Sequence, residues 1–193
     1  MVGRKLEFDR EEALEKAMNL FWFKGYNATG LNDLLNHMGI QRQSLYNTFG
    51  SKHALFLEAI RYYSDTVVRS LEQQLDAPGE PLENIRNLLK TLAEDAARPG
   101  YRGCLVANTI MELAPHDKAV EEAVGIVVRQ LEQAFERALK KAVVAGELSA
   151  STNPRELACF LYHVVLGINV RGKASLSCSS IDDILKVALS VLK

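Results

Sequence analysis

The sequence has few of the features that mark secreted, membrane-spanning or metal-stabilised proteins. Its three cysteines, Cys104, Cys159 and Cys178, are an odd number without Cys-x-x-Cys spacing, which argues against a disulfide framework or a zinc ribbon. The longest nearly apolar stretch covers residues 157–168, whereas a membrane-spanning helix needs roughly 20 apolar residues. Charged residues stand near the start where a signal peptide would be apolar, so we expect a cytoplasmic protein that does not use a membrane.

Signatures of common catalytic sites are also missing. The sequence contains no Gly-x-Ser-x-Gly, no phosphate-binding glycine-rich loop and no His-Glu-x-x-His, and no close Cys/His or carboxylate pair has an obvious role. We therefore predict that the chain is not an enzyme and needs no cofactor or metal. Its formal net charge of -1 excludes a histone-like polyanion binder but is compatible with a local DNA-reading surface.

Apolar residues recur at helical spacing along almost the whole chain, which predicts an all-α fold. Asp9, Ser51 and Asn153 stand where helix N-caps are expected. We divide the chain into a first helical domain at 1–52 and a second helical domain at 53–193, joined by a long helix. Three short helices are expected before residue 50, then helices at 52–75, 81–98, 103–113, 117–145, 154–171 and 180–192.

Residues 41–48, Gln-Arg-Gln-Ser-Leu-Tyr-Asn-Thr, have an unusual composition for a short helix. Only Leu45 is strictly apolar, and none of the eight residues is acidic. In the major groove Arg can bind guanine, and Gln or Asn can bind adenine, while Ser, Thr, Tyr and Lys can bind phosphates. The composition therefore favours a helix that reads DNA. The alternative is a short solvated helix, whose exposed face would usually mix Glu with Lys.

A longer ordered set of residues surrounds this helix. Phe21-Trp-Phe-Lys-Gly-Tyr-Asn-Ala-Thr29 is followed by Leu31-Asn-Asp-Leu-Leu, Met38-Gly-Ile40, Ser44-Leu-Tyr46, Phe49 and Ser51-Lys52. Over about residues 8–60 this set resembles the DNA-binding domain of the TetR family of bacterial transcriptional regulators. The resemblance implies that the second and third helices form a helix-turn-helix, with the third as the recognition helix.

The same resemblance implies which side chains contact DNA. Gln41 and Gln43 stand where Ser and Gly are frequent, and Gly30 stands where a second Thr often contacts phosphate, so we expect an altered operator sequence. Tyr46 has an alternative role as an aromatic side chain packed on the first helix. Carried over by position, the resemblance implies Asn32, Arg42 and Gln43 near base edges, Thr29, Tyr46, Thr48 and Lys52 near phosphates, and Ser44 and Asn47 near either.

The helices expected at 154–171 and 180–192 are too apolar to be half-solvated in a monomer. Pairing them with their symmetry copies gives a four-helix homodimer interface, and the alternative is a central helix in a monomer. Dimerisation would let two recognition helices reach major grooves about 34–36 Å apart. We expect Leu157, Phe160, Leu161, Val164, Val165 and Ile168 on one face, with Ala158, Tyr162, Gly167 and Asn169 left outside it.

The TetR resemblance implies that the second domain also binds a ligand. Gly103-Cys104 lies at the expected start of a helix, where unpaired N–H groups favour a thiolate. Gly-Cys-Leu followed by Asn108 and Glu112 is also similar to TetR-type regulators that respond to N-ethylmaleimide and related electrophiles. The alternative is a buried structural cysteine. We predict an effector site at Cys104, Asn108, Met111 and Glu112, with Tyr62, Tyr63 and Tyr162 as further candidates.

We therefore predict a dimeric, ligand-responsive transcriptional regulator, a repressor rather than an activator. It binds a palindromic double-stranded DNA operator through the helix at 42–48 and is released by a small-molecule effector of unknown identity. One alternative is a redox- or electrophile-sensing repressor that uses Cys104. Another is a helical adaptor that binds only protein, although residues 41–48 lack the apolar anchors at i, i+3, i+4 and i+7 that such a helix would show.

Overall fold

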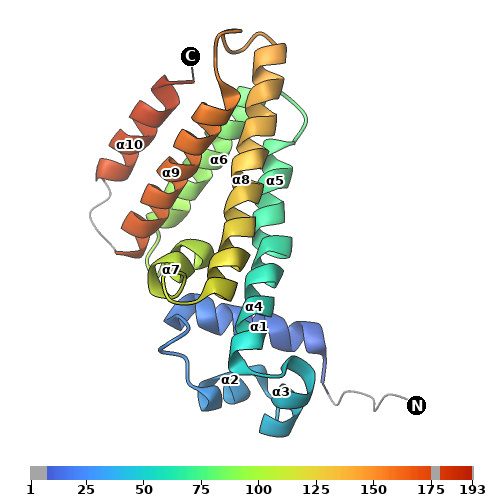
Figure 1. The fold of residues 1–193 in the computed structure, drawn as a ribbon. Coiled ribbons are helices and arrows are strands. Elements are labelled where there is room, and N and C mark those ends of the chain that lie inside the picture. The colour runs from blue at the N-terminus through green and yellow to red at the C-terminus, as the bar shows by residue number, and fades with distance from the viewer. Residues whose placement is uncertain (1–7, 175–178, 193) are drawn as a thin grey trace, which may run out of the picture.

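The computed structural model describes residues 8–174 and 179–192, and within these ranges it contains helices and no strand (Figure 1). The all-α prediction is confirmed for this part of the chain, while Cys178 lies outside the described residues. The elements are α1 (Arg10–Lys24), α2 (Leu31–Met38), α3 (Arg42–Phe49), α4 (Lys52–Tyr63), the π-helical turn η1 (Ser64–Val68), α5 (Arg69–Leu75), α6 (Pro81–Ala96), α7 (Leu105–Glu112), α8 (Lys118–Val144), α9 (Pro154–Lys173) and α10 (Ser179–Ser190).

Helix starts coincide with the N-caps that the sequence predicted. At the start of α1, the Asp9 carboxylate accepts hydrogen bonds from the backbone N–H groups of Glu11 at 2.8 Å and Glu12 at 3.0 Å. At the start of α4, the Ser51 hydroxyl accepts one from Ala54 at 3.0 Å. Such bonds satisfy amide groups that have no partner within the first helical turn, which is why these helices begin where they do.

Helices α1, α2 and α3 form a compact head at the lower end of the molecule in Figure 1. Phe21, Leu34 and Leu45, one from each helix, are almost completely buried together with Phe49. Phe56 of α4 packs edge-on against Phe21 with ring centroids 4.9 Å apart. Since each helix contributes to one core, the position of α3 is fixed, and its remaining side chains face outward.

The upper part of the molecule, the body, is built on α6, α8 and α9, with α10 against α6 and α9 (Figure 1). Its core contains Ile85 and Leu89 of α6, Phe135 and Leu139 of α8, and Leu161 of α9, all almost fully buried. None of the helices in the described ranges is long and apolar enough to cross a bilayer.

The head and the body share one continuous core. Leu105 of α7 and Val120 and Val124 of α8 belong to the same buried cluster as Phe21 of the head and Phe56 of α4. A short helix, α7, lies where the head meets the body (Figure 1). The two parts therefore cannot move independently without exposing apolar surface, and the domain boundary at 52/53 stays a prediction.

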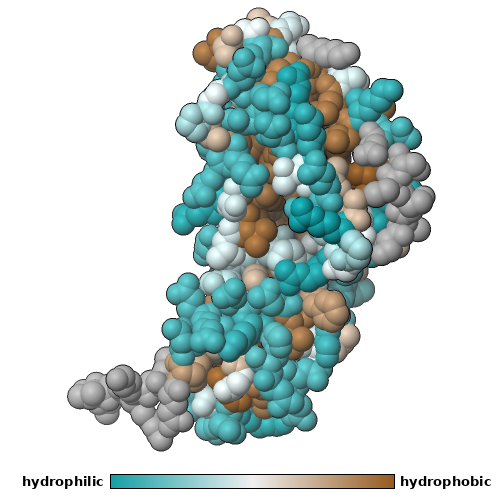
Figure 2. Space-filling view, turned by 180° about the vertical axis from the view of Figure 1, so that it is seen from behind, coloured by the Kyte–Doolittle hydropathy of each residue, from teal (hydrophilic) through white to brown (hydrophobic). Residues whose placement is uncertain are grey.

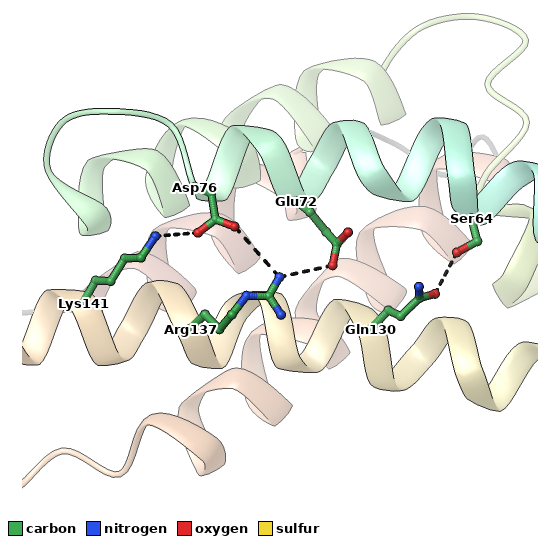
Figure 3. Close-up of polar contacts among 6 residues, drawn as sticks. All are labelled: Ser64, Glu72, Asp76, Gln130, Arg137 and Lys141. Atoms are coloured by element: carbon green, nitrogen blue, oxygen red, sulfur yellow. Dashed lines mark hydrogen bonds and ion pairs between the residues drawn. The ribbon is translucent and has the colours of Figure 1, made fainter.

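The helix predicted over 52–75 contains a π-helical turn that the sequence analysis did not predict. The Ser64 hydroxyl donates a hydrogen bond to Gln130 of α8 at 2.7 Å, as Figure 3 shows, and the Thr66 hydroxyl donates one to the Tyr62 carbonyl at 2.7 Å. Hydroxyl side chains of this kind compete with the backbone ladder and often bend helices. The π turn adds one residue to the helix locally and separates α4 from α5.

Beyond the π turn, charged side chains join α5 to α8 (Figure 3). Arg137 pairs with Glu72 at 3.2 Å and with Asp76 at 3.9 Å. Lys141 pairs with Asp76 at 2.6 Å. These pairs are largely exposed, so each contributes little to stability on its own, but together they keep α5 in register with α8.

The predicted faces of α9 are partly wrong. Ala158, Tyr162 and Asn169 are buried rather than left outside, whereas Phe160 is 41% exposed. Asn169 tolerates burial because its side chain accepts a hydrogen bond from the Tyr101 hydroxyl at 2.7 Å and donates one to the Val165 carbonyl at 2.8 Å. The free face of α9 contains Cys159, Phe160, His163, Gly167 and Val170.

Candidate nucleic-acid interface

Helix α3 presents a polar face to water, as the sequence analysis predicted. Leu45 and Phe49 are buried in the head and hold the helix in place. The exposed positions carry side chains that can bind base edges or phosphates, and the helix contains no acidic residue. Arg42, Gln43, Tyr46 and Asn47 are exposed, while Ser44 and Thr48 are half-buried.

Two hydrogen bonds order this face in the absence of DNA. The Arg42 guanidinium donates to the Asn32 side-chain oxygen of α2 at 3.1 Å, and the Gln43 amide donates to Asn47 at 2.9 Å. All four side chains were predicted to lie near bases or phosphates. Because these pairs already restrict rotamers, less conformational entropy remains to be lost on binding.

Three of the predicted phosphate contacts are not freely offered to DNA: two are bonded within the protein and one is buried. Thr29 is completely buried, and its hydroxyl donates to the Gly25 carbonyl at 2.5 Å. The Thr48 hydroxyl oxygen is buried and has no hydrogen-bond partner within the described residues. The Lys52 ammonium donates to the Tyr26 carbonyl at 2.7 Å, and burial lowers the pKa of Lys52. Their roles at phosphates stay predictions.

The segment before α7 brings Cys104 close to both tyrosine and tryptophan side chains. Cys104 is half-buried at the N-cap position of α7, and the Tyr63 hydroxyl donates to its sulfur at 3.5 Å. Burial, reinforced by the neighbouring Cys104, raises the pKa of Tyr63, so this phenol remains a donor at neutral pH. The Trp22 indole of α1 donates to the Gly103 carbonyl at 2.8 Å, which connects this segment directly to the head.

The structure does not bring the four predicted effector residues into one site. Asn108 lies near Cys104 and donates to the Arg102 carbonyl at 3.1 Å. Met111, however, is 79% exposed. The carboxylate of Glu112 is directed to the head, where it accepts hydrogen bonds from backbone amides. Only Cys104 and Asn108 thus occupy the same neighbourhood.

A separate groove of about 470 Å³ lies between α4, η1 and α8. Ile60 and Val127 contribute buried apolar surface to it. Arg61, Asp65 and Glu122 stand at its exposed rim. The combination of apolar surface with a few polar groups is typical of small-molecule sites, and sequence analysis gave no indication of this groove.

The free faces of α9 and α10 carry several exposed apolar side chains among polar ones. Val170 of α9 and Val187 of α10 are 57% and 63% exposed, and Phe160, Ile184 and Val191 are also exposed. From behind, Figure 2 shows hydrophobic surface along the upper body, whereas much of the lower end is hydrophilic. Large exposed apolar patches mark interaction sites in soluble proteins, which makes the exposed side chains of α9 and α10 candidates for one.

Comparison with known proteins agrees with this arrangement. The family model described as bacterial regulatory proteins, tetR family, matches residues 13–59, and the one described as tetracyclin repressor-like, C-terminal domain, matches residues 81–186. The HTH-type transcriptional regulator YezE of Bacillus subtilis (strain 168) is 35% identical over 99% of this chain and 100% of its own length. The HTH-type transcriptional repressor ComR of Escherichia coli (strain K12) is 26% identical over 99% of this chain and 90% of its own.

A solved structure is similar over nearly the full length. It is a cysteine mutant of the TetR family transcriptional regulator CifR, complexed with 26-bp double-strand operator DNA. Its TM-score is 0.85 and its identity 32%, covering 97% of this chain and 98% of that chain. TetR regulators are dimeric transcription factors that bind operator DNA, and they are not enzymes. This chain belongs to the TetR family of bacterial transcriptional regulators.

Proposed function

We propose that this TetR regulator is a repressor that binds a palindromic operator through α3 and leaves it when a small-molecule effector binds the body. The observation that carries the proposal is the exposed, acid-free face of α3 on a buried three-helix core. ComR, which this chain resembles over nearly its full length, is named as a repressor. The groove between α4 and α8 offers an effector space beside the helix that leads to the head.

The dimer forms through α9 and α10 in this proposal. Their free faces expose Phe160, Val170 and Val187, with Val191 exposed just after α10, and an isologous pair would cover these side chains with the same surface of the partner. Two α3 helices related by this axis would then address two half-sites about one turn of DNA apart. A Val187→Asp variant is expected to be monomeric by sedimentation and to lose cooperative operator binding.

The DNA-binding part is tested by selecting bound duplexes from a random pool with the purified full chain. We expect the selected sequences to form a palindrome. Arg42→Ala and Gln43→Ala should then each weaken binding at least about fivefold and relax the preference at one position per half-site. Arg69→Ala and Gln73→Ala, which change exposed residues of α5, are the matched controls. Selection of no palindrome, or unchanged affinity in the α3 variants, contradicts the proposal.

A second candidate function is the sensing of electrophiles by Cys104. It is favoured by the Tyr63 hydroxyl that donates to the Cys104 sulfur, because this donor stabilises a thiolate. Addition of the thiolate to a maleimide double bond forms a sulfur–carbon bond, and water supplies the proton to the neighbouring carbon. The adduct would need space beside Gly103, whose carbonyl binds Trp22 of the head.

The cysteine hypothesis is tested on the operator complex with N-ethylmaleimide as the probe. We expect release of the wild type and of Cys159→Ser, but not of Cys104→Ser. Cys159→Ser tests the other described cysteine, which lies away from the head on the free face of α9 and therefore in the proposed dimer interface. Equal release of all three proteins eliminates Cys104 as the sensor.

A further inference from the structure

We propose that the α7–α8 connector, residues 112–117, fixes the position of the head on the body and thereby sets the half-site spacing that the dimer accepts. The inference rests on the proposed binding of a palindromic operator. It assigns a role in operator specificity to residues that do not belong to α3. Two carboxylates, one at each end of the connector, contact two different points of the head region.

The first contact is made by Glu112 at the end of α7. Its two carboxylate oxygens accept hydrogen bonds from the backbone N–H groups of Asn27 at 2.7 Å and Tyr26 at 3.1 Å, in the turn between α1 and α2. A Cβ atom at Gly25 would lie 2.8 Å from the Glu112 carboxylate, so this approach requires glycine. Hydrogen bonds to an ionised acceptor are stronger than those between neutral groups.

The second contact is made by Asp117 at the start of α8. One of its oxygens lies 2.7 Å from the His53 imidazole in the first turn of α4, and the other accepts the Val120 N–H at 3.1 Å. The bond from Val120, with a smaller contribution from His53, lowers the pKa of Asp117, so the group is a carboxylate at neutral pH. Asp117 therefore caps α8 and holds α4 at the same time.

Lys52 and Tyr26 join these two points into one unit. The Lys52 ammonium donates to the Tyr26 carbonyl at 2.7 Å and lies 4.1 Å from the centre of the Tyr26 ring. The ring itself packs on Phe56 of α4, with centroids 4.9 Å apart. The turn held by Glu112 and the helix start held by Asp117 consequently move together.

Two contacts restrict more than one contact can. The shared core already joins head and body, and two separated polar contacts on a common unit restrict rotation of the head further than one contact would. In a dimer, rotation of each head changes the separation and tilt of the two α3 helices, which must enter grooves about 34–36 Å apart. We therefore expect the connector to determine how strongly the dimer discriminates between half-site spacings.

The experiment uses the duplex selected by the wild type, together with versions that carry one or two base pairs more or fewer at the centre. Glu112→Ala and His53→Ala, singly and combined, remove the two contacts while Asp117 can still cap α8. Glu121→Ala, which removes an exposed carboxylate from α8 outside the groove, is the matched control. We expect the double variant to bind the selected duplex about tenfold more weakly and to lose about tenfold in its preference for the native spacing.

Salt dependence separates this effect from the loss of a phosphate contact. Removing a phosphate contact lowers the slope of log affinity against log salt by about one, whereas loss of positioning leaves the slope unchanged. An unaltered spacing preference, or a loss of affinity that is matched by a lower slope, overturns the inference. A wild type that selects no duplex would refute the proposed function instead.

Hydrogen exchange on the DNA-free protein tests the contact itself. The amides of Tyr26 and Asn27 should be protected in the wild type and in Glu121→Ala, and should exchange at least about tenfold faster in Glu112→Ala. Glu112→Gln, which keeps the size of the side chain, should give an intermediate rate. Equal protection in all four proteins overturns the inference independently of any operator.

Discussion

The approach of Glu112 to Gly25 gives a quantitative test of the contact between body and head. Gly25 has φ 84° and ψ 169°, a region that is essentially restricted to glycine, so Gly25→Ala costs about 1–3 kcal/mol in the backbone. The new Cβ would also lie 2.8 Å from the Glu112 carboxylate and displace it from Tyr26 and Asn27. Loss of hydrogen bonds to a charged group adds about 1.5–3 kcal/mol. We expect Gly25→Ala to lower the free energy of unfolding by about 2.5–6 kcal/mol in total.

Urea unfolding of a double-mutant cycle at one protein concentration separates the two contributions. In a Glu112→Ala background the carboxylate is already absent, so Gly25→Ala should cost only the backbone strain, and the coupling should be about 1.5–3 kcal/mol. Gly39→Ala is the control, because Gly39 has φ 72° but no atom within 4 Å of the added Cβ. Additivity of Gly25→Ala and Glu112→Ala within about 0.5 kcal/mol would refute the contact.

Three further predictions concern the head and the helix caps. Leu45→Ala should lower the free energy of unfolding by about 2–5 kcal/mol, and a single thermal transition should persist because head and body share a core; two separate transitions would contradict this. Asn153→Ala should cost about 1 kcal/mol in urea without changing operator affinity, and a loss of DNA binding would be unexpected. The Lys24 ammonium, and then the Gly30 N–H, lower the pKa of Asp33. The ionised Asp33 therefore stabilises the fold above the ordinary carboxyl pKa, and this stabilisation is lost as the pH falls through the lowered pKa of Asp33. In an NMR titration Lys24→Met should raise the Asp33 midpoint, and an unchanged midpoint would exclude this ion pair.

The features that the sequence predicted correctly depend on neighbours along the chain. Asp9, Ser51 and Asn153 were identified as caps because a cap acts on amides two or three residues away. The exposed face of α3 was predicted because the helix has only two apolar positions, Leu45 and Phe49, that can enter a core. Both features depend on residues only a few positions apart, so a short stretch of sequence is enough to predict them.

The features that were missed depend on distant partners. Asn169 was expected outside the apolar face of α9, yet a hydrogen bond from Tyr101, 68 residues earlier, allows its burial. A helix that is apolar on nearly all sides does not indicate which side faces its own chain. The π turn likewise depends on Gln130, 66 residues after Ser64.

The contacts of Glu112 were also missed because its partners are far away in the sequence. It was predicted as an effector ligand, but its hydrogen-bond partners are 85 and 86 residues away in the sequence. One local signal was present. A glycine that ends a helix leaves the next amides without helical partners, and Tyr26 and Asn27 follow Gly25 directly. Such amides need an acceptor, but the sequence does not identify which carboxylate supplies it.

The two ends of α7 are the route by which chemistry in the body can reach the head. The carbonyl of Gly103, just before α7, binds Trp22 of α1, and Glu112 at its other end binds the turn that follows α1. A helix of eight residues is short and stiff, so a shift at Cys104 must strain one of these contacts. An effector changes operator affinity only if it binds the two head positions with different affinity. Since α7 contacts the head at both ends, a modified Cys104 that tilts α7 would meet this condition, as would a ligand in the groove that shifts α4.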